Sequence, residues 1–247
     1  MEIILFLIAL FATTLGSLAG LGGGIIIKPI LDLLHMDVLT VGMLSSLTVL
    51  SMAVVSSAKH LHAKRVGMRI LYLGIGASVG GFIGNFLLLG MATDPIYLQK
   101  LQSASLAVIL AVILVLMRLK SKIKPMHITS KSTSVIVGLL LGVISSFLGI
   151  GGGPLNVIVL FLMFGLNAKD AAASSVFIIM FAQVTKIFFI TGDFDVSYLY
   201  YMVPGGVIGG FLGAFYNKRI SERAVTITFN VMIFMMILLN LYNYGLF

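Results

Sequence analysis

The chain has 247 residues, of which 60% are hydrophobic and only 10% are charged. Soluble domains carry about 25% charged residues, so this composition excludes a chain that faces water on all sides. The net charge of +8 does not indicate nucleic-acid binding, because most Lys and Arg residues lie in three short stretches between apolar runs. The chain has no cysteine, which excludes disulfides and thiolate chemistry.

Apolar runs of about 17 to 25 residues recur along the chain, and such a run is long enough to cross a bilayer as a helix. No segment alternates apolar and polar residues as a transmembrane β-barrel would. The first run begins with Glu2 and not with a basic segment, so we expect it to be part of the fold. The predicted class is an all-α polytopic membrane protein, with helices near residues 3–19, 25–34, 41–58, 68–91, 98–117, 132–148, 155–166, 171–191, 198–215 and 224–240.

Two glycine-rich stretches interrupt these runs. Residues 20–24 read Gly-Leu-Gly-Gly-Gly, and residues 149–153 read Gly-Ile-Gly-Gly-Gly, 129 positions later. Glycine costs about 1 kcal/mol in a helix relative to alanine, so four in five positions should end the helix. One straight helix over residues 3–34 would be about 48 Å long, whereas the hydrocarbon core is about 30 Å thick. We therefore predict a broken, re-entrant hairpin at each stretch.

The offset of 129 positions also relates the regions that follow the two breaks. It places Ser45-Ser46 on Ser174-Ser175, Tyr72 on Tyr201, and the glycines at 76, 80, 81 and 84 on those at 205, 209, 210 and 213. The sequence therefore predicts a first repeat at residues 1–117, a basic linker at 118–131 and a second repeat at 132–247. Each repeat would hold a glycine-broken hairpin followed by three transmembrane helices.

Clusters of basic residues predict the orientation. They lie at residues 59–65, 118–131 and 217–223, and the positive-inside rule places all three in the cytoplasm. His60 and His62 belong to the first cluster and are expected in a solvated loop. The acidic stretch at 192–195 falls on the outer face by this count, although it corresponds by the offset to the cytoplasmic loop. The two repeats are therefore predicted to be inverted, an architecture common among secondary transporters.

Two longer motifs resemble the TauE/SafE family. Residues 16–31 read GSLAGLGGGIIIKPIL and residues 142–160 read GVISSFLGIGGGPLNVIVL, and they resemble the first motif of that family and its second copy. The small-residue stretch at 171–175 and the segment at 59–84 are also similar. The resemblance implies a multi-pass transporter of a bacterial or archaeal plasma membrane, with sulfite or organosulfonates such as sulfoacetate as substrates.

Three positions depart from the family pattern. Ile158 stands where Pro29 stands in the first copy, and Lys28 and Asn156 are not residues expected throughout the family. A different small anion is therefore an alternative to the substrates that the resemblance implies.

The glycine breaks form the first part of the predicted substrate site. Helix N-termini carry about half a positive charge and bind anions, and the helices that start after the breaks would point two such ends at one cavity. The alternative is that the glycines only allow close helix crossing, a purpose that glycines four apart already serve. The predicted residues of this part are Gly22, Gly23, Gly24, Gly151, Gly152 and Gly153.

Polar side chains within the apolar runs form the second part. The hydroxyls of the paired serines could bind oxyanion oxygens, or they could bond other helices or their own backbone. Lys28 could neutralise an anion or pair with Asp32 four residues later, and Lys186 could neutralise an anion or extend to the interface. The predicted residues of this part are Ser45, Ser46, Ser174, Ser175, Asn156, Gln183, Lys28 and Lys186.

No enzyme, cofactor, metal or nucleotide site is predicted, because the sequence has no HExxH motif and no P-loop. Transport would then be secondary and proceed by alternating access around the midplane site. The sequence leaves open whether H⁺ or Na⁺ is coupled or transport is passive. A passive anion channel and a non-transporting membrane assembly subunit are the alternative functions, and nothing in the sequence specifies a homodimer.

Overall fold

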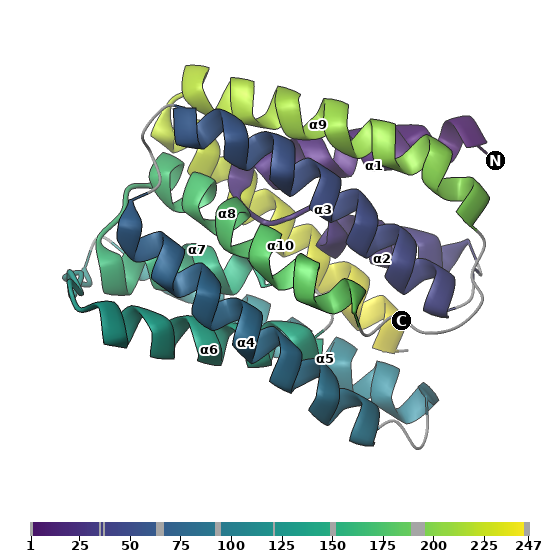
Figure 1. Cartoon of the computed structure of the whole chain (residues 1–247), viewed down its shortest axis with the longest axis horizontal. Helices are drawn as coiled ribbons and strands as arrows, with labels where there is room; N and C mark the ends of the chain where they lie inside the picture. The colour runs from purple at the N-terminus through teal and green to yellow at the C-terminus, as the bar shows by residue number, and fades with distance from the viewer. Residues whose placement is uncertain are drawn as a thin grey trace.

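The computed structural model describes residues 2–34, 36, 38–62, 67–91, 95–120, 122–148, 152–188 and 196–244. These residues form ten α-helices and one short 3-10 helix, arranged as a bundle of roughly aligned rods (Figure 1). Seven segments of the described chain are long and apolar enough to cross a membrane, which confirms the all-α polytopic class. The elements are α1 (Glu2–Ala19), α2 (Gly24–Leu33), α3 (Val38–His62), α4 (Met68–Met91), α5 (Pro95–Leu119), α6 (Lys131–Leu148), α7 (Gly153–Phe164), α8 (Ala168–Ile187), η1 (Val196–Tyr198), α9 (Leu199–Arg219) and α10 (Glu222–Tyr244).

Both glycine stretches end a helix. α1 stops at Ala19 and α2 starts at Gly24, while α6 stops at Leu148 and α7 starts at Gly153. Gly22 and Gly152 have φ angles of 72° and 78°, in the left-handed region that residues with a Cβ rarely adopt. α2 has 10 residues and α7 has 12, so each is less than about 20 Å long and too short to cross the bilayer.

Backbone hydrogen bonds form beside each break. The N–H of Gly22 donates to the carbonyl of Gly16 in the last turn of α1 at 3.3 Å, which satisfies a carbonyl freed at the end of that helix. In the second half, the linker segment just before α6 pairs with the end of α7. The N–H groups of Met126 and Ile128 donate to the carbonyls of Leu162 and Met163 at 2.9 and 2.8 Å. α6 therefore begins at the same end of the bundle at which α7 finishes.

Helix pairs on opposite sides of the bundle use equivalent glycines. α4 lies along α6, and α9 lies along α1, because glycines let the two backbones approach closely. Gly76, Gly80 and Gly84 of α4 face the carbonyls of Val135, Leu139 and Val143, and Gly205, Gly209 and Gly213 of α9 face those of Phe6, Leu10 and Thr14. Each glycine of α9 lies 129 positions after its counterpart in α4, and each carbonyl of α1 lies 129 positions before its counterpart in α6. Residues that the sequence offset relates therefore make the same packing contacts. In Figure 1 the α1/α9 pair runs toward the left and the α4/α6 pair toward the right.

Basic helix ends gather at one end of the bundle, on the left in Figure 1. Lys218 Nζ in the last turn of α9 donates to the carbonyl of Lys59 near the end of α3, at 3.2 Å. Lys169 Nζ at the start of α8 donates to the carbonyl of Lys218 at 2.9 Å. Arg69 Nη1 at the start of α4 lies 3.4 Å from the carbonyl of Ile128 in the linker. Lys59 of the first cluster and Lys218 of the third therefore meet, and part of the linker contacts the start of α4.

One sequence expectation about this face is wrong. α3 continues to His62, so Lys59 and His60 are helical, and the His60 side chain is fully buried. The apolar residues that precede them extend the helix beyond the predicted end at residue 58. Residues 63–66 of the first basic loop and residues 192–195 of the acidic loop lie outside the described residues.

Candidate substrate site at the glycine breaks

The two glycine breaks meet in the middle of the bundle. Gly153, the first residue of α7, lies against the backbone of Leu21 in the segment between α1 and α2, and a Cβ at this position would overlap Leu21. Gly20 packs in the same way against the backbone of Ala172 in α8. Stretches more than 120 residues apart in the sequence are thus in direct backbone contact, and α8 covers both.

Ser175 joins the two breaks. Its hydroxyl lies 2.5 Å from the carbonyl of Gly20 and 3.3 Å from the carbonyl of Gly153, so it donates to one and lies within reach of the other. A broken helix in a membrane must have its freed carbonyls satisfied by other parts of the protein, and Ser175 serves this purpose. Ser175 therefore lies where the two breaks meet, and it donates its proton to the backbone.

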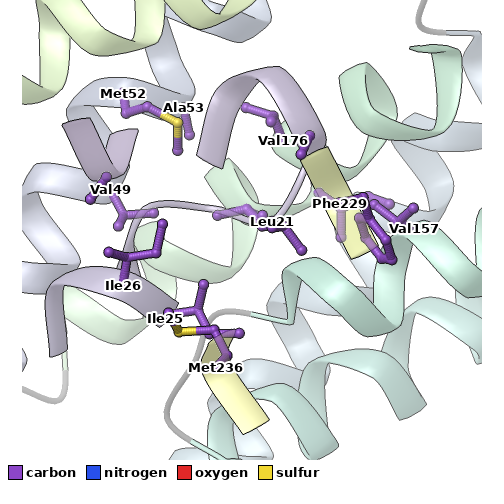
Figure 2. Close-up of a cluster of buried hydrophobic side chains, with 14 of the residues drawn as sticks. Leu21, Ile25, Ile26, Val49, Met52, Ala53, Val157, Val176, Phe229 and Met236 are labelled. Atoms are coloured by element: carbon purple, nitrogen blue, oxygen red, sulfur yellow. The ribbon is translucent and has the colours of Figure 1, made fainter. Parts of the chain in front are cut away.

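Apolar side chains enclose the first break (Figure 2). Leu21 is fully buried and lies on the extended segment between α1 and α2, with Val176 of α8 and Phe229 of α10 beside it. Ile25 and Met236 lie on the side of α2. The centre of the bundle is therefore filled by side chains, and the described conformation is closed around Leu21.

The remaining serines lie close to the breaks. A Cβ on Gly24 would first meet Ser45 Oγ, at 3.1 Å, so Ser45 faces the start of α2. Ser46 and Ser174 are buried, with 1% and 0% of their surface exposed, and their hydroxyls have no hydrogen-bond partner within the described part of the chain. Unpaired buried hydroxyls are uncommon, so each of these two serines calls for an explanation.

Two buried amides accompany the serines. Asn156 lies in the first turn of α7, 1% exposed, and its Oδ1 has no partner within the described ranges. Gln183 is 4% exposed, and its Oε1 is likewise unpaired there. Gln183 is one helical turn beyond Ile179, the residue of α8 that faces Gly22. Both amides therefore belong to the surroundings of the breaks.

Lys28 lines a small cavity beside α2. The cavity has a volume of about 30 Å³ and lies between α2, α5 and α10. Lys28 and Asp32 both line it, one helical turn apart, so the lysine has a carboxylate close by. The other lining residues are Gly24, Ile25, Pro29, Gln102, Ser103, Leu106, Leu148 and Asn240.

The structure does not describe the surroundings of two predicted site residues. Gly151 is outside the described residues, and of Lys186 only the helical backbone in α8 is described. The sequence did not identify Gln102, Ser103 and Asn240 as residues of this cavity, and it indicated Asp32 only as a partner of Lys28. Their only signal in the sequence was a polar residue inside an apolar run, and nothing there indicated that they share a cavity.

Comparisons with known proteins place the chain in a family. Residues 5–239 match the family model described as Sulfite exporter TauE/SafE. The probable membrane transporter protein YunE of Bacillus subtilis (strain 168) is 27% identical, over 94% of both chains. YdhB of the same organism, also named a probable membrane transporter protein, is 27% identical over 92% of this chain and 96% of its own. A probable membrane transporter protein of Haemophilus influenzae is 27% identical over 88% of this chain and 86% of its own.

No solved structure matches the chain. The family match covers nearly all of the sequence, and the relatives are named as membrane transporters and not as enzymes. Together with the seven apolar helices, this makes the chain a multi-pass protein of the cell membrane. The chain belongs to the sulfite exporter TauE/SafE family of membrane transporters.

Proposed function

We propose that the chain is a secondary transporter of small sulfur-containing anions, namely sulfite or organosulfonates such as sulfoacetate, and that it works by alternating access. The observation that carries this proposal is the contact of the two broken helices, in which Gly153 of α7 lies against the backbone of Leu21. Transporters commonly bind substrate where two broken helices meet near the midplane. The family description, which names sulfite export, supports the choice of substrate.

The proposal includes two inverted repeats, each beginning with a re-entrant hairpin. The equivalent glycine contacts of the α4/α6 and α9/α1 pairs support the repeat. The opposite directions of these pairs in Figure 1 support the inversion. The pairing of Met126 with Leu162 supports a hairpin in the second half, because it holds the start of α6 beside the end of α7.

In this proposal, the starts of α2 and α7 attract the anion through their partial positive charge. The unpaired hydroxyls of Ser46 and Ser174 then donate to its oxygens without fixing a full charge. Because the Leu21 backbone lies beside Gly153 in the closed form, the anion enters when the two hairpins separate there. The left-handed glycines at each break allow the chain to bend at that point.

The function is tested with purified protein in proteoliposomes and labelled sulfite and sulfoacetate. A transporter accumulates label faster when unlabelled anion is present on the opposite side, whereas a channel shows no such stimulation. Sulfite or sulfoacetate uptake with this stimulation is the expected result. The absence of both uptake and binding for every sulfur oxyanion tested would reject the proposed substrates.

The site is tested by adding one methyl group where the breaks meet. Gly153→Ala should slow uptake about 5- to 150-fold, because overpacking in a tight contact costs about 1–3 kcal/mol. Gly42→Ala in α3 is the matched control, since a Cβ there meets nothing within 4 Å. Gly24→Ala, whose Cβ would lie 3.1 Å from Ser45 Oγ, is a milder variant that keeps the test available if Gly153→Ala fails to fold. Full activity in folded Gly153→Ala and Gly24→Ala would place the substrate elsewhere.

A further inference from the structure

The cavity that holds Lys28 has a counterpart in the other half of the chain. The first cavity is lined by α2, by the first part of α5 through Gln102 and by the end of α10 through Asn240. The second is lined by α7, by the end of α5 through Met117 and by the first part of α10 through Phe229. The two cavities therefore use equivalent helices at opposite ends of the bundle.

The chemistry of the two cavities differs. The offset of 129 positions carries Lys28 to Val157 and Asp32 to Phe161, and both of these apolar residues line the second cavity. Lys120 just after the end of α5 also lines the second cavity, so the same packing is achieved there with one cation but without a charged pair on the short helix. A lysine at membrane depth costs at least about 2.5 kcal/mol on insertion scales, so a pair that the fold does not require calls for a functional explanation.

We propose that the Lys28–Asp32 cavity is a proton-coupled anion site, in which a proton on Asp32 releases Lys28 to bind the transported anion. This inference rests on the proposed function and names its coupling ion. With Asp32 ionised, the cavity is neutral and its carboxylate competes with any anion for the ammonium group. When Asp32 takes up one proton to become a carboxylic acid, the cavity has a charge of +1 and holds one monovalent anion.

The transport step is balanced in charge and protons. One H⁺ and one monovalent anion bind from the same side, and both leave when the carboxylic acid loses its proton on the other side. Lys28 remains protonated throughout and pairs alternately with the anion and with the Asp32 carboxylate. For a monovalent anion such as hydrogen sulfite, the coupled movement is therefore electroneutral, and an external acid pH favours uptake.

The groups that face Asp32 suit this role. Gln102 and Ser103 from α5 and Asn240 from α10 are neutral, and Leu148 comes from α6. α1 and α3 face the start of α2 with Thr13, Ser45 and Val49. Lys28 is therefore the one charged side chain among the described residues that line this cavity with Asp32.

Two amides at the cavity are held in place by the backbone. Gln102 Nε2 donates to the carbonyl of Phe147 at 2.7 Å, and Asn240 Nδ2 donates to the carbonyl of Met236 at 2.8 Å. An amide oxygen can accept a hydrogen bond from a protonated carboxyl group or from an ammonium group. Both states of the Lys28–Asp32 pair thus have polar neighbours.

The size of the cavity sets the order of events. A volume of about 30 Å³ holds about two or three water molecules, since about 10–15 Å³ accommodates one, and it excludes a sulfonate. A proton can therefore reach Asp32 through water in the closed form, whereas the anion enters only after α2 has moved away from α5 and α10. Protonation precedes anion binding in this scheme.

The experiment measures proton movement with methanesulfonate, a monovalent anion that stays ionised at neutral pH. Proteoliposomes containing a pH-sensitive dye should acidify by one proton per methanesulfonate taken up, and an imposed membrane potential should not change the rate. Asp32→Asn should still take up methanesulfonate down its gradient, but without acidification and without dependence on external pH. Lys28→Gln should lose uptake at every pH, and Asp32→Glu should retain the coupling.

Glu222→Gln at the exposed start of α10 is the matched control for loss of a carboxylate and should behave like the unaltered protein. The inference is overturned if Asp32→Asn acidifies the vesicles at the ratio of the unaltered protein. It is equally overturned if the unaltered protein takes up methanesulfonate with no acidification or in proportion to the membrane potential, and this measurement needs no variant. Failure of the unaltered protein to bind or transport sulfite or any sulfonate would instead reject the proposed function.

Discussion

Ser174 and Ser175 are adjacent residues with opposite surroundings. The hydroxyl of Ser175 donates to a freed backbone carbonyl at the break, whereas that of Ser174 is buried with no partner in the described ranges. We therefore expect Ser175→Ala to lower the free energy of unfolding by about 1–2 kcal/mol, because buried carbonyls lose their donor. Ser174→Ala should leave stability unchanged and raise the KM for the anion.

Thermal unfolding in detergent and uptake kinetics, measured on both variants, separate a structural serine from a substrate-binding one. For a domain of 150–250 residues, 1 kcal/mol corresponds to about 2–4 °C in Tm. A loss of stability in Ser174→Ala with none in Ser175→Ala would reverse these assignments.

The helix pairs α4/α6 and α1/α9 pack through equivalent glycines, so we expect Gly→Ala substitutions at equivalent positions to lower the stability of the protein equally. A Cβ at Gly80 would meet the carbonyl of Leu139, and one at Gly209 would meet the carbonyl of Leu10. Gly80→Ala and Gly209→Ala should each destabilise the protein by about 1–3 kcal/mol, since neither backbone can move without separating its helix pair. Thermal unfolding checks this, with Gly42→Ala as the neutral control. A large effect in one variant and none in the other would show that the two pairs are not equivalent.

The sequence predicts most of the helices, because a long apolar run bounded by glycines or charged residues forms a helix in a bilayer. It does not predict the end of α3, since the polarity of Lys59 and His60 indicates a loop, whereas packing against neighbouring helices buries His60. The glycine breaks are predictable because four glycines in five positions end a helix, and the same pattern recurs 129 positions later. The Lys28 cavity is not, because its polar residues come from α2, α5 and α10, and one unaligned sequence does not indicate which distant polar residues meet.

At the scale of the whole molecule, the basic helix ends on one face predict the orientation in the membrane. Lys59, Lys169 and Lys218 meet there, so the positive-inside rule places this face in the cytoplasm. The start of α9, including Ser197 just before it, then lies outside. α4 and α9, which the offset of 129 positions relates, run in opposite directions in Figure 1, as the proposed inversion of the repeats requires.

The absence of native cysteines makes this orientation directly measurable, because an introduced cysteine is the only thiol in the chain. Ser130 and Ser197 are both exposed, and they lie at the linker face and at the opposite face. A membrane-impermeant maleimide added to intact cells should label Ser197→Cys and leave Ser130→Cys unlabelled until the membrane is opened. Ser221→Cys, at the start of α10, should behave like Ser130→Cys, since both lie beside basic residues. Labelling of Ser130→Cys in intact cells would show that the protein has the opposite orientation in the membrane. Labelling of all three variants would show that the basic helix ends do not all lie on the cytoplasmic face.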